Sequence, residues 1–320
     1  MDEFSLIQNI KQPYYKQSSL IKGIGDDAAV FREINNDLVV AVDTFVEGVH
    51  FTKETMEPFH VGYRGLAANF SDMAAMGAIP IYYLVSITVP PDLEETSINE
   101  VFKGMETLAK QHHADLIGGD TVSGNSLILS ITVIGKVEKD KARFRSEAQA
   151  GDIVFVTGTL GDASAGLHLL QGKVNIENRN YFINRHRMPT PRVDFARELA
   201  GLKRVALNDT SDGIASEAHE IAEASKVSII LIDESIPVHP NFREFSPELQ
   251  RKWKFFGGED FELLGTVSQT NWSKVQKAAT ESHLKVSEIG YVTHKENDYV
   301  YVKEGGVLKP LIKAGYNHLK

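Results

Sequence analysis

Carboxylates gather in short glycine-rich or turn-like segments that lie far apart along this chain. These segments are Gly25-Asp26-Asp27, Val42-Asp43-Thr44, Asn69-Phe70-Ser71-Asp72, Gly118-Gly119-Asp120-Thr121, Asp209-Thr210-Ser211-Asp212-Gly213 and Gly257-Gly258-Glu259-Asp260. Acids that serve solubility fall on exposed helix faces, whereas acids at strand ends and in glycine turns can converge on one point. Converging hard oxygen ligands favour divalent metal ions. The sequence therefore predicts a Mg²⁺ site, together with the phosphates that accompany this ion.

Each segment also has an ordinary explanation. Gly and Asp are common in turns, and Asp43 ends an apolar stretch where any polar residue would serve. The stretch from Asp209 to Gly213 precedes an expected helix, where Asp and Ser are frequent caps. His50 stands between apolar neighbours, which is more often the setting of a structural histidine than of a ligand. Asp72 is different, because an acid in a helix of small residues is costly to bury without a cation.

The sequence lacks the motifs of several reaction classes. The chain lacks G-x-x-x-x-G-K-[ST], H-E-x-x-H and G-x-S-x-G, and no pair of nucleophile and base stands out. Residues 23–28 fit G-x-G-x-x-A, but the expected strand follows them instead of preceding them, and Asp26 and Asp27 would repel a pyrophosphate. We interpret this segment as a loop that carries metal ligands.

Composition narrows the possible partners. The formal net charge is -9 and Lys and Arg form no run, which argues against nucleic acid. The absence of Cys excludes disulfides, thiolate nucleophiles and the common zinc and iron–sulfur sites. The start, Met1-Asp2-Glu3-Phe4, lacks the features of a signal peptide, and no apolar run reaches the roughly 20 residues of a membrane span. We expect a cytoplasmic protein without membrane contact.

Periodicity predicts a mixed α/β (α+β) chain of two domains, as its 320 residues also suggest. The first half reads β-α-β-α-β-β, with strands at 38–42, 81–89 and 127–137 and helices at 61–76 and 98–109. Residues 116–117 are too few for more than a strand end, so Gly118-Gly119-Asp120-Thr121 is expected to follow a strand. A charged connector at 138–149 leads to a second α/β half that opens with a strand at 152–156. We place the domains at 1–140 and 150–320.

Read in order, seven motifs resemble those of the thiamine-monophosphate kinase family, and the likeness runs over nearly the whole chain. The motifs occupy residues 23–29, 43–51, 69–78, 118–121, 156–163, 209–213 and 257–263. The segments that contain His50 and Asn69 separate this family from relatives such as aminoimidazole ribonucleotide synthetase, selenophosphate synthetase and a hydrogenase-maturation protein.

The resemblance implies ATP-dependent phosphorylation of thiamine phosphate to thiamine diphosphate, by a transferase that uses several Mg²⁺ ions and often a monovalent cation such as K⁺. It also implies a homodimer in which the N-terminal strands pair into a shared barrel, with the C-terminal halves packed alongside and completing the sites. The metal ligands implied by motif match are Asp27, Asp43, Asp72, Asp120, Asp209 and Asp212. The implied contacts of ATP are Gly119, Asp120, Arg145 and Ser211. Those of thiamine phosphate are His50, Glu259 and Tyr316.

This assignment agrees with the chemistry of the residues. The acceptor is a phosphate oxygen that is already ionised, so no side-chain nucleophile or general base is needed, and Arg145 would stabilise transition-state charge. One departure is that Ala41 and Val42 stand where the family carries hydroxyl residues, so a side-chain hydroxyl contact to metal must be absent there or replaced. Two alternatives stay open: a related ATP-using synthetase with another substrate, and a non-catalytic nucleotide-binding regulator.

Overall fold

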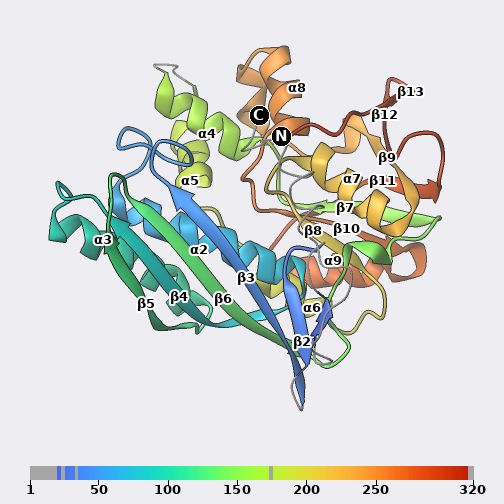
Figure 1. Ribbon diagram of the computed structural model, residues 1–320. Helices are drawn as coiled ribbons and strands as arrows, with labels where there is room; N and C mark the ends of the chain where they lie inside the picture. The colour runs from blue at the N-terminus through green and yellow to red at the C-terminus, as the bar shows by residue number, and fades with distance from the viewer. Residues whose placement is uncertain (1–19, 23–25, 33–34, 173–175, 316–320) are drawn as a thin grey trace.

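The chain folds around two β-sheets, one from each half of the sequence (Figure 1). The computed structural model describes residues 20–22, 26–32, 35–172 and 176–315. The N-terminal sheet has the strand order β1-β2-β3-β6-β4-β5, and the C-terminal sheet has the order β13-β12-β9-β11-β7-β10-β8. Both sheets are open within one chain. The expected mixed α/β fold with two halves is confirmed.

The N-terminal sheet is largely antiparallel, and only β4 and β5 run parallel. Its strands are β1 (Leu20–Lys22), β2 (Ala29–Arg32), β3 (Asn36–Val46), β4 (Ile79–Val89), β5 (Asp115–Ser123) and β6 (Ile128–Glu138). Helix α2 (Pro58–Ala75) packs on one face of the sheet, and α3 (Glu95–Gln111) packs against α2. Side chains alternate between the two faces of a strand, so Val39, Ala41 and Phe45 of β3 and every second residue of β6 enter the core beneath α2.

Helices α2 and α3 touch backbone to backbone because glycines stand at their crossing. A Cβ atom on Gly62 would lie 1.8 Å from the carbonyl oxygen of Val101, and one on Gly104 would lie 1.9 Å from that of Phe59. A side chain at either position would separate the helices. This close approach fixes α2, and therefore the acidic segment at its C-terminal end, relative to the sheet.

The C-terminal half surrounds its own sheet with helices and short 3₁₀ turns. The strands are β7 (Asp152–Thr157), β8 (Ala206–Asp209), β9 (Val227–Ile232), β10 (Leu263–Ser268), β11 (Val286–His294), β12 (Val300–Glu304) and β13 (Val307–Pro310). The helices are α4 (Asp162–Gln171), α5 (Arg179–Arg187), α6 (Val193–Glu198), α7 (Ile214–Ser225), α8 (Pro247–Phe256) and α9 (Trp272–Glu281). Buried aliphatic residues of β7, β9 and β11 form its core with α7. The 3₁₀ turns are η1 (Arg145–Glu147), η2 (Asp233–Ser235), η3 (Pro240–Glu244) and η4 (Gln269–Asn271).

Two local expectations are wrong, and one helix was not predicted. Gly118-Gly119-Asp120-Thr121 does not follow a strand but lies inside β5, where a Cβ atom on Gly119 would be 1.9 Å from the carbonyl oxygen of Val85. Gly119 therefore serves close strand pairing. Asp43 does not end a strand, because β3 continues to Val46. Helix α8 was not expected, although Ser246 caps it and Pro247 opens it.

None of the helices in the described part of the chain has the length and apolar character that a membrane-spanning helix needs.

Candidate functional site: an acidic cluster between the two sheets

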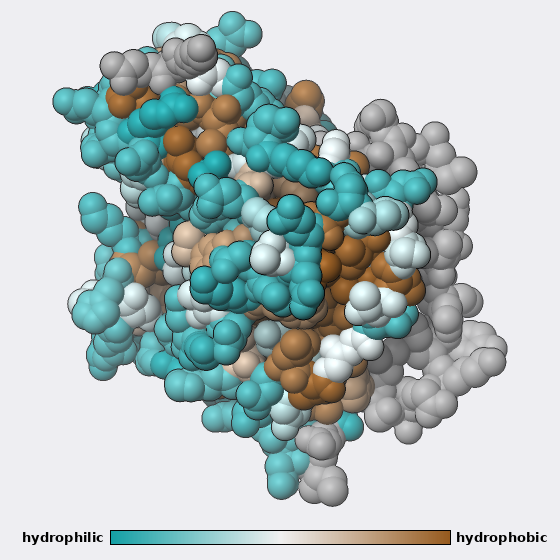
Figure 2. Space-filling model, turned by 90° about the vertical axis from the view of Figure 1, so that its left-hand side faces the viewer, coloured by the Kyte–Doolittle hydropathy of each residue, from teal (hydrophilic) through white to brown (hydrophobic). Residues whose placement is uncertain are grey.

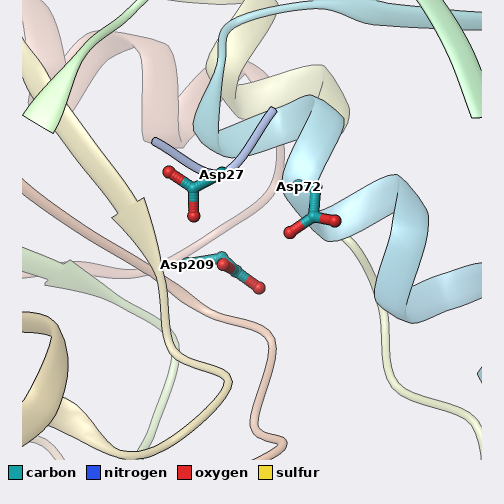
Figure 3. Close-up of side chains that lie close together, drawn as sticks. All are labelled: Asp27, Asp72 and Asp209. Carbon is teal, nitrogen blue, oxygen red and sulfur yellow. The ribbon is translucent and has the colours of Figure 1, made fainter. Parts of the chain in front are cut away.

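Three aspartates from distant parts of the sequence meet between the two halves (Figure 3). Asp27 lies just before β2, Asp72 is on α2, and Asp209 ends β8. One carboxylate oxygen from each lies within 4.8 Å of those of the other two. The expectation that acids of both halves converge holds for these three residues.

The cluster is built by contacts between the two halves. The hydroxyl of Ser71 on α2 donates a hydrogen bond of 2.7 Å to Oδ2 of Asp209, so the helix of one half orients an acid of the other. Asp209 is 2% exposed. The charge of Arg145 also acts on Asp209, but the neighbouring acid Asp27 opposes it, so further compensation by a metal ion would favour the ionised carboxylate.

Asp43 joins this group from the face of β3 that is turned toward α2. Its backbone N–H donates to Oδ1 of Asn69 over 3.2 Å, and the Asn69 side chain in turn donates to the carbonyl oxygen of Gly65. Asn69 thus attaches the middle of β3 to α2. Strand alternation turns the Val42 side chain to the opposite face from Asp43. A hydroxyl side chain at position 42 in this backbone would also point away from Asp43.

The four carboxyl groups repel one another, and their pKa values show it. Desolvation and then the charge of Asp27 raise the pKa of Asp43 to about 6. Burial and the neighbouring acids Asp43 and Asp209 raise the pKa of Asp72 well above its usual range. Burial and Asp27 do the same for Asp209. Hard oxygen ligands that crowd together without enough cations fit Mg²⁺, because the ion removes the repulsion and each ligand offers an oxygen.

Arg145, in η1, is the principal cation at the cluster. Its Nη2 and Nε atoms lie 2.8 Å and 3.1 Å from the two carboxylate oxygens of Asp27, a forked pairing, and its Nη1 lies 3.0 Å from Glu220. Asn208 accepts from Nε as well, at 3.2 Å. Burial raises the pKa of the Asp27 carboxyl, and Arg145 counteracts this rise. The arginine therefore offsets part of the acidic charge.

The turn that carries Ser211 and Asp212 is held by an acid that the sequence analysis did not single out. Glu217, in the first turn of α7, accepts hydrogen bonds from the backbone N–H of Asp212 at 2.9 Å and from the Ser211 hydroxyl at 3.4 Å. Its other oxygen accepts from Asn208 at 2.6 Å. Asp212 itself lies outside the group of three converging aspartates. The signal in the sequence was an acid in the first turn of a helix, which is common and therefore weak.

Gly119 and Asp120 lie on β5, apart from the three aspartates. With Val85 and Phe102 they line a shallow pocket of about 480 Å³. Oδ1 of Asp120 accepts the backbone N–H of Thr121 at 2.9 Å, and the residue is exposed. The structure thus separates these two positions from the acidic cluster within one chain.

The residues expected at thiamine phosphate lie in different settings. Nδ1 of His50 accepts the backbone N–H of Val46 at 3.0 Å, and the ring stacks on Phe45. Glu259 pairs with Arg64, whose side chain is fully buried on α2. Tyr316 lies outside the described residues. Sequence analysis missed Arg64, although a single cation among the small and apolar residues of α2 requires an acid partner.

Comparisons with known proteins agree with this architecture. The family model of the AIR synthase related protein N-terminal domain matches residues 25–137, and that of the C-terminal domain matches residues 149–303. The chain is 47% identical to the thiamine-monophosphate kinase of Bacillus subtilis (strain 168) over 326 residues, which covers 100% of both proteins. It is 33% identical to that of Haemophilus influenzae, with 100% of this chain and 98% of the relative covered.

Two solved structures are similar over almost the whole chain. The structure titled AaThiL complexed with AMPPCP and TMP has a TM-score of 0.86 and 30% identity, and the match covers 99% of this chain and 97% of the other. The thiamine-monophosphate kinase of Stenotrophomonas maltophilia K279a has a TM-score of 0.79 and 35% identity, with 95% and 98% covered.

Proposed function

Because this chain belongs to the thiamine-monophosphate kinase family, we propose that its acidic cluster serves the ATP-dependent phosphorylation of thiamine phosphate to thiamine diphosphate. The chain is accordingly an enzyme, a phosphotransferase whose acceptor is a phosphate group. The observation that carries the proposal is the convergence of Asp27, Asp72 and Asp209 in a chain that matches its relatives from end to end. A solved relative of the same fold binds AMPPCP, an analogue of ATP, together with TMP.

The reaction brings two anions together, and this determines what the protein must supply. The acceptor oxygen of thiamine phosphate is ionised at neutral pH, so positioning and charge compensation replace proton abstraction. Two unit charges 4 Å apart repel by about 4 kcal/mol at an effective dielectric constant near 20. Mg²⁺ bound by Asp27, Asp43, Asp72 and Asp209 would neutralise this charge at the point of transfer. Arg145 would stabilise charge on the transferred phosphoryl group.

We assign different residues to the two substrates. Arg145 and Ser211 would contact ATP beside the cluster, with Asp212 as a further metal ligand. Gly119 and Asp120 lie apart from the cluster within one chain, so they would contact ATP, and Asp120 would bind metal, only from the partner subunit of a homodimer. His50, Glu259 and Tyr316 would contact thiamine phosphate. The division at 140–150 also remains our proposal, as do K⁺ as an additional cation and the cytoplasm, where ATP and phosphate-ester metabolites occur, as the location.

The test of the function is an assay with purified protein, ATP, Mg²⁺ and thiamine phosphate. Equal amounts of ADP and thiamine diphosphate are expected, and excess EDTA should abolish both. Formylglycinamidine ribonucleotide as acceptor tests the related synthetase, and it should give no product. ATP binding by calorimetry with no transfer to either acceptor would instead favour the nucleotide-binding regulator.

We further propose that the N-terminal sheet forms a homodimer through the face that α2 does not cover. Apolar residues of this face are open to solvent: Val42 is 60% exposed and Tyr82 is 42% exposed. On β5, Val122 is 50% exposed. Figure 2 views the side of the molecule on which β5 forms the sheet edge, and hydrophobic residues gather there in a band. Large apolar patches of this kind mark association sites, and strand edges attract further pairing.

Replacing Tyr82 with aspartate should convert the dimer into a monomer, because the new charge would be buried without a partner in the proposed interface. Analytical ultracentrifugation measures the mass directly. The matched control is Tyr291→Asp on β11, where the tyrosine is 40% exposed but belongs to the other sheet. A monomeric wild-type protein, or an unchanged dimer in Tyr82→Asp, would contradict this interface.

A further inference from the structure

Arg64 is a charged residue in a place that ordinarily holds apolar ones. Its side chain is 0% exposed and is one of the largest fully buried side chains in the described structure. Its neighbours on α2 include Gly62, Gly65 and Leu66, all of which are buried. A buried guanidinium needs a compensating charge, and the Nε and Nη2 atoms of Arg64 form no hydrogen bond in the described structure, so the ion pair with Glu259 is its main compensation. The identity of its partners therefore indicates what this arginine does.

The partners of Arg64 all belong to the C-terminal half. Its guanidinium forms an ion pair with the carboxylate of Glu259 and lies 5.8 Å from the centre of the Phe261 ring. Its Nη1 is 3.1 Å from Nδ1 of His186. Burial, followed by the charge of Arg64, lowers the pKa of His186 to about 2, so this imidazole is a neutral acceptor. Among the described residues, Glu259 is the acid with which Arg64 forms an ion pair.

The backbone at Glu259 is fixed independently of Arg64. Its N–H donates to the carbonyl oxygen of Ser211 at 2.7 Å, and the N–H of Phe261 donates to that of Thr210 at 3.2 Å. A Cβ atom on Gly258 would lie 2.3 Å from the Ser211 carbonyl oxygen, so the loop rests directly on the turn that follows Asp209. What the backbone leaves undetermined is the direction of the Glu259 side chain.

That backbone is also strained, which is typical of a functional segment. Glu259 has φ +66° and Phe261 has φ +50°, values that non-glycine residues seldom adopt. The Glu259 side chain nevertheless stays 34% exposed while its partner is completely buried. The strain therefore does not serve to bury the carboxylate. It presents a carboxylate to solvent beside the acidic cluster, with a cation behind it.

We propose that Arg64 is a positioning residue, which holds the Glu259 carboxylate in one orientation for the organic part of thiamine phosphate. The proposal rests on the proposed function, in which Glu259 contacts this substrate. A carboxylate would repel the phosphate, whereas the cationic thiazolium ring and the amino group of the pyrimidine would attract it. Arg64 acts through Glu259 and does not itself reach the substrate.

The test compares KM for thiamine phosphate with KM for ATP in Arg64→Met, Arg64→Lys, Glu259→Gln and the double variant Arg64→Met/Glu259→Gln. Arg64→Met should raise KM for thiamine phosphate by about 10-fold to 100-fold, the range expected for a displaced positioning group. KM for ATP should change by less than about twofold. Arg64→Lys keeps the positive charge, so its KM for thiamine phosphate should stay closer to the wild-type value than that of Arg64→Met. The double variant should resemble Glu259→Gln alone, because the two residues act in series.

The controls separate this inference from folding and from the proposed function. Arg251→Met removes an arginine that pairs with Glu304 on β12, away from η1 and the cluster, and it should leave both KM values unchanged. If Arg64→Met does not fold, Arg64→Gln decides, because it removes the charge, keeps a polar side chain and should raise KM for thiamine phosphate by the same factor. Equal changes in both KM values, or additive effects in the double variant, would overturn the role of Arg64. A wild-type protein that does not phosphorylate thiamine phosphate would instead refute the proposed function.

Discussion

Replacing Asp72 with asparagine should lower kcat by about 10³-fold, because the change removes a charge that the bound metal ions require. Asp72 lies at the centre of the cluster, with oxygens of Asp27 and Asp209 within 4.8 Å. Asparagine keeps the shape of the side chain, so the loss reports charge and not packing. Steady-state kinetics at saturating ATP and thiamine phosphate, over a range of Mg²⁺ concentrations, measures the effect.

The same variant should be more stable than the wild type when no metal is present. Burial and the charges of Asp43 and Asp209 raise the pKa of Asp72 in the folded protein above the value of 3.8 that an isolated aspartate has. As the pH rises past 3.8, the unfolded chain loses this proton and the folded chain retains it, so the wild type loses stability. The asparagine side chain of the variant has no such proton to lose. The difference in unfolding free energy should be near zero below about pH 4 and should grow toward neutral pH to about 1 kcal/mol.

Thermal unfolding in EDTA between about pH 4 and pH 8 measures this difference, and adding Mg²⁺ should reverse its sign because only the intact cluster gains from the ion. The control is Asp37→Asn. Asp37 is also buried, but it pairs with Arg32 at the other end of β3 from Asp43, so this change should destabilise the protein and leave activity intact. Retained turnover in Asp72→Asn, or equal destabilisation in both variants, would contradict the metal assignment.

The sequence predicted the elements whose apolar periodicity is regular. The strand at 127–137 and the helix at 61–76 correspond to β6 and α2, with ends shifted by one to three residues. The sequence did not predict the elements whose structure depends on which strand they pair with. Residues 115–123 contain two glycines and two aspartates, which locally favour a turn, yet pairing with β4 makes them a strand. Only the folded chain shows that Gly119 lies against the Val85 backbone.

Only part of the candidate site could be predicted from the sequence. The sequence showed which acids would need a cation to compensate their charge, and three of them, Asp27, Asp72 and Asp209, lie close together. The residues that hold these acids in place could not be identified from the sequence. Ser71 donates a hydrogen bond to Asp209, and Asn69 accepts one from the backbone N–H of Asp43, and both contacts join distant parts of the chain. A hydroxyl or amide has no sequence pattern that reveals a partner in a distant part of the chain.

Replacing Arg145 with methionine should lower kcat by about 10³-fold, as expected when an arginine that stabilises phosphoryl charge is lost. In metal-free protein, however, its effect on stability should be opposite to that of Asp72→Asn. Arg145 forms the forked pair with Asp27 and also contacts Glu220, so its removal leaves buried acids without their main cation. Thermal unfolding in EDTA should show a lower Tm, and Mg²⁺ should recover part of the loss by taking over the compensation.

Two further variants determine whether charge or geometry matters at Arg145. Arg145→Lys keeps the charge but cannot form the two parallel bonds to Asp27, so it should retain most of the metal-free stability and only a small part of kcat. Arg251→Met, which removes an ion pair with Glu304 on β12, should leave kcat unchanged. The opposite stability changes of Asp72→Asn and Arg145→Met, combined with similar losses of activity, are the signature of a cluster with excess negative charge. If both variants lost stability in EDTA, the acids would already be compensated within the protein, and the case for Mg²⁺ at this cluster would fail.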